Sequence, residues 1–94
     1  MDHITHFEIP LDKDNPDKTI DFYKKTFNWE AEKWDGPMPY WVARTVEVDE
    51  QYMPKESGAI NGGFTTKEDI KSPTIVVSVD NIKEKLETVK ENGG

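Results

Sequence analysis

Polar and apolar residues alternate over residues 3–9, and this alternation predicts a β-strand with two different faces. One face consists of Thr5, Phe7 and Ile9, and the other consists of Ile4, His6 and Glu8. A helix that packs on the first face leaves His6 and Glu8 to point away from it, because successive side chains of a strand alternate.

A helix is predicted over residues 16–27, after Pro10 ends the first strand and a polar turn follows. Pro16 suits the first helical position, with Asn15 as its N-cap. Asn28 suits a left-handed C-cap. The apolar stripe of this helix consists of Thr19, Ile20, Tyr23, Thr26 and Phe27.

Four further strands are predicted from short runs of aromatic and β-branched residues between turn signals. They cover residues 29–34, 40–48, 58–64 and 74–79. The third of them contains the pair Gly62-Gly63, which indicates a bulge or a close approach of the backbone to another group.

A second helix is predicted over residues 81–92. Asn81 with Glu84 resembles a capping box, and Gly93 is the expected C-cap. The apolar face of this helix consists of Ile82, Leu86 and Val89.

The order strand, helix, three strands, strand, helix predicts an α+β fold with a βαβββ module, a mainly antiparallel sheet and helices on one face. A length of 94 residues gives room for one domain. In the predicted order of elements a strand–helix unit occurs twice, but only its first copy is followed by three strands.

Composition narrows the classes of function. The formal net charge of −7 makes nucleic acid an unfavourable partner, and the absence of cysteine excludes disulfides and thiolate chemistry. No apolar run approaches the roughly 20 residues of a membrane helix, so no membrane partner is expected. Met1-Asp2-His3 lacks signal-peptide features, so we expect a cytoplasmic protein.

Several segments together resemble the vicinal oxygen chelate superfamily of glyoxalases, bleomycin-resistance proteins and extradiol dioxygenases, especially its small members related to lactoylglutathione lyase. The segments are His6-Phe7-Glu8-Ile9-Pro10, Ile20-Asp21-Phe22-Tyr23, Phe27-Asn28-Trp29, Gly36-Pro37-Met38, Tyr40-Trp41, Ile60-Asn61-Gly62-Gly63, Val79-Asp80-Asn81-Ile82 and Glu91-Asn92-Gly93-Gly94. The resemblance covers nearly the whole chain and is specific in combination.

The resemblance implies two βαβββ modules whose sheets curve around a cavity. Residues 1–64 would form a complete first module, and residues 73–94 would form the start of the second. The three strands that normally follow are not in this sequence. We therefore expect a chain cut short at its carboxyl end, either as a fragment or by true loss.

His6 matches the position at which metal-dependent members of the superfamily carry a histidine ligand. The other ligand positions match Thr74 and the segment 59–63, which has no carboxylate. One histidine falls short of the three protein ligands typical of a catalytic metal. We therefore expect no metal and no cofactor, with Glu8 as the candidate general base.

Four further residues are candidates for ligand binding. Tyr40 and Arg44 share one face of their strand and Trp41 shares the other with Ala43, and either face could line the cavity. An aromatic residue beside an arginine suits a planar or anionic ligand. Asn61 could add an amide. For each candidate, the alternative is a purely structural role in packing or in a solvated surface.

The resulting hypothesis is a small-molecule-binding domain without a metal and with no assigned reaction. The alternatives are a metal-dependent lyase or dioxygenase of the same superfamily, and a non-catalytic dimerisation or binding module. We also expect a homodimer, because one module leaves sheet edges exposed and twofold dimers are the commonest assembly.

Overall fold

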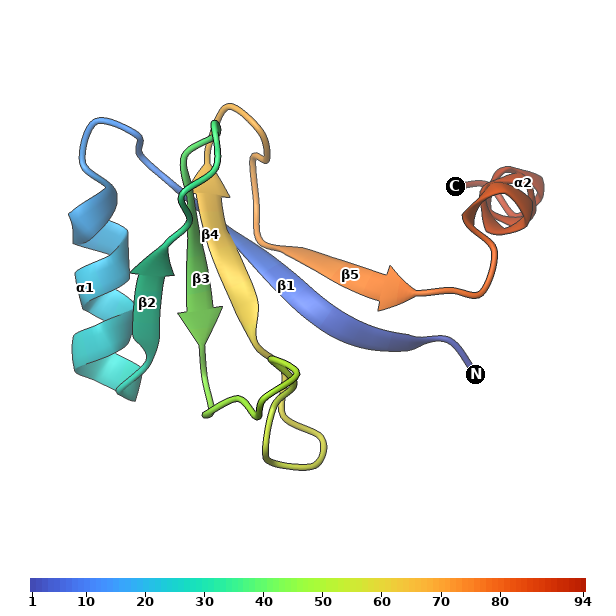
Figure 1. The fold of residues 1–94 in the computed structure, drawn as a ribbon. Coiled ribbons are helices and arrows are strands. Elements are labelled where there is room, and N and C mark those ends of the chain that lie inside the picture. The colour runs from blue at the N-terminus through green and yellow to red at the C-terminus, as the bar shows by residue number, and fades with distance from the viewer.

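The computed structural model describes residues 1–94 and contains two helices and one open sheet of five strands (Figure 1). The elements are β1 (His3–Leu11), α1 (Pro16–Phe27), β2 (Glu30–Lys33), β3 (Tyr40–Arg44), β4 (Gly62–Thr66), β5 (Thr74–Ser78) and α2 (Ile82–Glu91). The strand order is β2-β3-β4-β1-β5, with β1 and β4 parallel and all other neighbours antiparallel. This architecture confirms the α+β class and the order of a βαβββ module followed by a strand and a helix.

The predicted end of the first strand at Pro10 is wrong, because β1 continues to Leu11. Pro10 pairs with Thr65 of the parallel neighbour β4. On its other side β1 pairs with β5 only from His3 to Glu8. Pro10 therefore lies where the strand has a single neighbour, a position at which a sheet tolerates the missing N–H.

The strands predicted over residues 40–48 and 58–64 also differ from the structure, since β3 ends at Arg44 and β4 begins only at Gly62. Beyond Arg44, the backbone N–H groups of Thr45 and Val46 donate to Oδ1 of Asn61 instead of to a neighbouring strand. The Asn61 side chain thus takes the place of a neighbouring strand as the hydrogen-bond acceptor. The pairing of β3 ends there, and the loop over residues 45–61 begins (green to yellow in Figure 1).

The core lies between α1 and the sheet. Its buried apolar residues are Leu11, Ile20, Ala43 and Phe64. Phe7 and Ile9 pack against this core from β1, as the helix-packing prediction requires. Because α1 covers that side, His6 and Glu8 belong to the opposite face of the sheet. Aromatic contacts reinforce the core, since the Tyr23 and Trp29 rings stack with centroids 4.9 Å apart.

The predicted caps Asn15, Asn28 and Asn81 occupy cap positions, whereas the C-cap of α2 is Asn92, one residue before the predicted Gly93. Asn28 is left-handed with φ 62°, Asn81 accepts a hydrogen bond from Glu84 N, and Gly93 is left-handed with φ 89° at the end of α2. Asn15 occupies the N-cap position of α1 as predicted, but its side chain makes no cap hydrogen bond. The turn before α1 is organised instead by Asp12, whose carboxylate accepts from Asp14 N.

The second helix departs from the expectation that both helices cover one face of the sheet. α2 has no buried residue, and Figure 1 shows it at the opposite end of the molecule from α1. An ion pair of 2.9 Å between Lys85 and Asp2 joins it to the start of β1. No strand lies over the apolar side of α2, so Ile82, Leu86 and Val89 stay exposed.

The molecule is therefore extended. Its accessible surface is 7389 Å², whereas a compact monomer of its mass exposes about 5,500 Å². Its radius of gyration is 15.0 Å, against about 12 Å for a compact domain of this length. Neither helix has the length and apolar character needed to cross a membrane.

Candidate functional site

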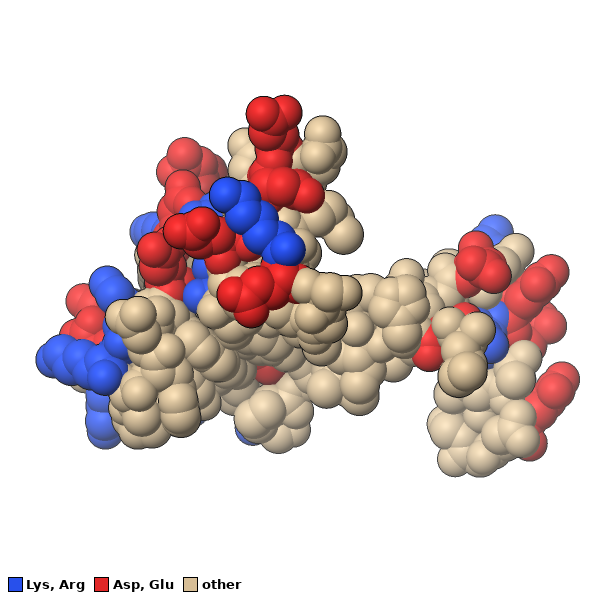
Figure 2. Space-filling view, turned by 90° about the horizontal axis from the view of Figure 1, so that it is seen from below, with Lys and Arg blue, Asp and Glu red and all other residues tan.

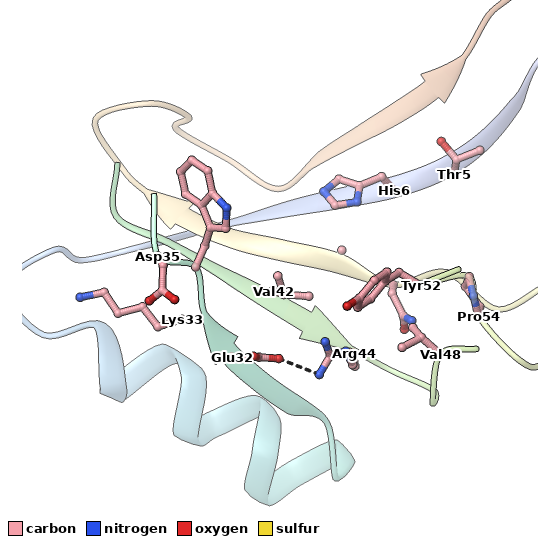
Figure 3. A pocket seen from close by; sticks show the side chains of 13 residues that line it. Thr5, His6, Glu32, Lys33, Asp35, Val42, Arg44, Val48, Tyr52 and Pro54 are labelled. Carbon is pink, nitrogen blue, oxygen red and sulfur yellow. Dashed lines mark ion pairs between the residues drawn. The ribbon is translucent and has the colours of Figure 1, made fainter. Parts of the chain in front are cut away.

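The face of the sheet opposite α1 carries a cavity of about 460 Å³ (Figure 3). Its floor comes from Val42 of β3 and Gly62 of β4, and one wall comes from His6 of β1. Arg44 and Glu32 line it from β3 and β2, and the loop over residues 45–61 closes one end. The cavity thus lies where the strand alternation places the polar side chains of β1.

The alternation along β3 decides which of its predicted residues face the cavity. Ala43 is fully buried and Trp41 packs against the same core on the α1 side. Tyr40, Val42 and Arg44 therefore share the opposite face. Trp41 does not join the candidate site, and its ring is instead covered by the Lys33 ammonium at 5.8 Å.

A bulge in β1 changes the predicted position of Thr5. The pairing of β1 with β5 shifts register between Ile4 and His6, so that one extra residue is inserted. As a result, the neighbours Thr5 and His6 both line the cavity. The prediction that Thr5 shares a face with Phe7 is therefore wrong, whereas the shared face of His6 and Glu8 is confirmed by their hydrogen bond.

The structure brings three of the predicted residues together in one hydrogen-bonded cluster. Nε2 of His6 lies 2.9 Å from Oε1 of Glu8 and 3.1 Å from the hydroxyl of Tyr40. The Tyr40 hydroxyl also donates to Oε1 of Glu8 at 3.2 Å. Two of these residues come from β1 and one comes from β3, although β4 lies between the two strands.

Gly63 explains how Tyr40 reaches across β4. In the sheet register Gly63 lies between Glu8 on one side and Val42 on the other. A Cβ atom built on Gly63 would overlap the Tyr40 hydroxyl and ring. The ring therefore occupies the space that any larger residue would fill, and the backbone conformation of Gly63 is not itself unusual.

The cluster orients the imidazole of His6. A carboxylate beside Nε2 favours the tautomer that carries its proton on Nε2, so Nδ1 keeps its lone pair. Nδ1 makes no hydrogen bond within the protein. His6 lines the cavity, whereas Glu8 lies behind it with Oε2 buried and without a partner. Nδ1 of His6 is therefore an acceptor available in the cavity wall, and Glu8 is positioned to hold the imidazole ring.

Tyr40 acts as a hydrogen-bond donor in this cluster. Burial raises the pKa of its hydroxyl above the ordinary value, and the charge of Glu8 and the hydrogen bond to it act in the same direction. The hydroxyl consequently keeps its proton throughout the physiological range.

Arg44 and Asn61 are partnered within the protein. Arg44 forms an ion pair of 3.0 Å with Glu32 at the cavity wall, which reduces its attraction for an anionic ligand. Oδ1 of Asn61 accepts from Thr45 N at 2.7 Å, from Val46 N at 3.1 Å and from the Thr45 hydroxyl at 3.2 Å. Asn61 lines the cavity and its amide also holds the loop, since Nδ2 donates to the Val46 carbonyl at 3.2 Å, and its ligand-binding role stays a prediction.

Sequence reasoning missed Tyr52, which lines the cavity from the loop over residues 45–61. Its φ of 61° is a conformation that residues other than glycine rarely adopt, at a cost on the order of 1–3 kcal/mol. An aromatic residue inside an otherwise polar loop was the available signal. The left-handed backbone that places it could not be deduced from that signal.

The donor atoms around His6 do not make a complete metal site. No group of three or more His, Cys, Asp or Glu side chains is close enough together to hold a metal ion. Thr74 lies directly opposite Glu8 in the pairing of β5 with β1, but its hydroxyl donates to the Ser72 carbonyl. His6 and Glu8 alone fall short of a catalytic metal centre, and metal independence stays a prediction.

Comparison of the sequence with protein-family models and with curated proteins found no match. The function of this chain is therefore inferred from its own residues and their geometry.

The raised pKa of Tyr40 predicts a late step in an alkaline titration. Because the folded pKa lies above the ordinary value of about 10, the cluster stabilises the fold below pH 10 and loses that contribution as the pH rises further. Ultraviolet absorbance of tyrosinate should show a step above this range that is absent from Tyr40→Phe. A wild-type titration without such a late step contradicts the buried donor role of Tyr40.

Proposed function

We propose that this chain is a glyoxalase- and bleomycin-resistance-like domain that binds a small molecule on the sheet face opposite α1, without a resident metal. The observation that carries the proposal is the cavity of about 460 Å³ with His6 in its wall and Glu8 and Tyr40 holding His6 from behind. A concave site with a few convergent polar groups is the usual form of a small-molecule site.

The resemblance of the sequence to the vicinal oxygen chelate superfamily supports the same proposal, because it concerns the segments that build β1, α1 and β4. A cytoplasmic location belongs to this proposal as well. The absence of cysteine fits a reducing compartment, in which small domains do not rely on disulfides.

The polar end of the cavity suits a ligand with a hydroxyl or N–H group. Nδ1 of His6 would accept a hydrogen bond from that group, while Nε2–H keeps its own hydrogen bond to Glu8. The same arrangement suits proton transfer. If Nδ1 removed a proton from the ligand, the resulting imidazolium would be stabilised by the Glu8 carboxylate, and the electron pair of the broken bond would remain on the ligand. The reaction itself is unassigned.

A fragment screen followed by amide chemical shifts tests the proposal. Bound fragments should shift the amides of Val42, Arg44 and Gly62, which line the cavity. His6→Ala should weaken the binding of these fragments about 2- to 10-fold, because a bound fragment loses one hydrogen bond. His3→Ala is the matched control, since it removes the other histidine from the exposed start of β1 and should leave the affinity unchanged.

Two results contradict small-molecule binding at this face. One is a screen in which no fragment shifts these amides, and the other is a set of hits confined to the α1 side of the sheet.

A homodimer is a second proposal, and the excess surface supports it. The chain exposes roughly 1,900 Å² more than a compact monomer of its mass, which exceeds the roughly 800 Å² that a standard interface buries on each partner. Much of the exposed apolar area lies on β5 and α2, at Ile75, Val77, Ile82, Leu86 and Val89. Figure 2 shows charged side chains over both ends of the molecule, with a largely uncharged region between them.

Light scattering tests the dimer with two matched variants. Leu86 on α2 and Phe22 on α1 are similarly exposed, at 54% and 55%. The wild type and Phe22→Lys should have twice the mass of the chain, whereas Leu86→Lys should be a monomer. A wild type that stays monomeric at high concentration contradicts the dimer.

A further inference from the structure

The loop over residues 45–61 contains a short hairpin that ends over the cavity. Val48 and Pro54 form an isolated β-bridge, and Lys55 N donates to the Glu47 carbonyl at 2.9 Å. Closer to the tip, Asp49 N donates to the Met53 carbonyl at 2.8 Å. These pairs leave three residues, 50–52, at the tip.

The Asp49 side chain holds this tip in one conformation. Its Oδ1 accepts from Gln51 N at 2.9 Å and from Met53 N at 3.0 Å, and its carbonyl accepts from Tyr52 N at 3.0 Å. A turn of this kind, followed by one left-handed residue, is a common three-residue hairpin loop. The left-handed position normally belongs to glycine, and here it is occupied by Tyr52 with φ 61°.

The side chain of Tyr52 makes few contacts within the protein. Its side chain is 78% exposed, and no hydrogen bond or aromatic contact holds it. Figure 3 shows it extending from the loop toward the part of the cavity that Val42 lines. A strained residue that contributes little to packing indicates a role in contact with another molecule.

Val42 and the backbone of Gly62 line the cavity together with Tyr52. Gly62 presents only backbone to the cavity, because a Cβ on this residue would point to the other face, into Phe7. Val42 continues the floor on the neighbouring strand. Polar and charged side chains line the rest of the cavity, among them His6, Arg44 and Glu32. An aromatic ring that faces a valine and a stretch of backbone without a side chain, with polar groups nearby, suits a planar ligand.

We infer that Tyr52 is a ligand-binding residue and that the cavity takes a planar aromatic small molecule with a polar substituent on its edge. The ligand's ring stacks on Tyr52 and rests on Val42 and the Gly62 backbone. The polar substituent meets His6 or Arg44. This inference rests on the proposed function, since it specifies the class of ligand for the same cavity.

The test compares 2-naphthol with its saturated analogue decahydro-2-naphthol, which matches it in charge and approximate size and keeps a hydroxyl that can donate to Nδ1 of His6. Dissociation constants come from amide-shift titrations of the wild type, Tyr52→Gly and Tyr52→Phe. The aromatic probe should bind the wild type about 5- to 10-fold more tightly than the saturated probe. Tyr52→Gly should remove that preference, and Tyr52→Phe should keep it.

Thermal unfolding provides a second readout. Tyr52→Gly should raise the Tm by about 4–8 °C, because glycine relieves the left-handed strain, while Tyr52→Phe should not. Loss of affinity together with a gain in stability shows that the variant is folded and that Tyr52 serves binding.

The outcomes separate this inference from the proposed function. If both probes bind the cavity equally well, or if Tyr52→Gly keeps the aromatic preference, the inference is wrong while small-molecule binding stands. If neither probe shifts the amides of Val42 and Gly62, the inference is wrong, and the fragment screen alone decides whether the cavity binds another class of small molecule.

Discussion

Two adjacent glycines in β4 allow an aromatic ring to lie on each face of the sheet at its centre. A Cβ on Gly62 would overlap Phe7 on the α1 side, and a Cβ on Gly63 would overlap Tyr40 on the cavity side. Phe7 belongs to the packing around the core, and Tyr40 belongs to the hydrogen-bonded cluster with His6 and Glu8. The packing around the core therefore depends on the absence of a side chain at Gly62, and the candidate site depends on its absence at Gly63.

The two faces of the sheet serve different purposes as a consequence. On the α1 side, close packing of Leu11, Ala43 and Phe64 excludes water and stabilises the fold. On the other side, the absence of a side chain at Gly63 leaves room for polar groups from β1 and β3 to meet. The carboxylate of Glu8 then fixes the imidazole of His6 through Nε2, so that Nδ1 is the atom of this ring that remains as an acceptor for a ligand.

Local patterns predicted the elements well because each depends on neighbouring residues. Alternation and capping were sufficient for α1, for the shared face of His6 and Glu8, and for the left-handed Asn28. The strand limits depended on partners far away in the chain. Asn61 bonds to the backbone of Thr45 and Val46, across a separation that no local pattern encodes.

The candidate site was predicted only in part, because it too depends on contacts between residues that lie far apart in the chain. The strand alternation grouped Tyr40 with Arg44, but only the burial of Ala43 shows which face meets the core. The bulge at Thr5 and the left-handed backbone of Tyr52 depend on pairing and hydrogen bonding that form only in the folded chain. The exposed position of α2 likewise reflects what packs on it, and local helix signals carry no information about that.

A double-mutant cycle between Gly63 and Tyr40 tests most directly whether the missing side chain at Gly63 makes room for the cluster. Urea unfolding should show that Gly63→Ala destabilises the wild type by about 1–3 kcal/mol, because the added methyl group overlaps the Tyr40 ring. In a Tyr40→Ala background the same substitution should cost less than about 0.5 kcal/mol. An equal cost in both backgrounds would contradict the account.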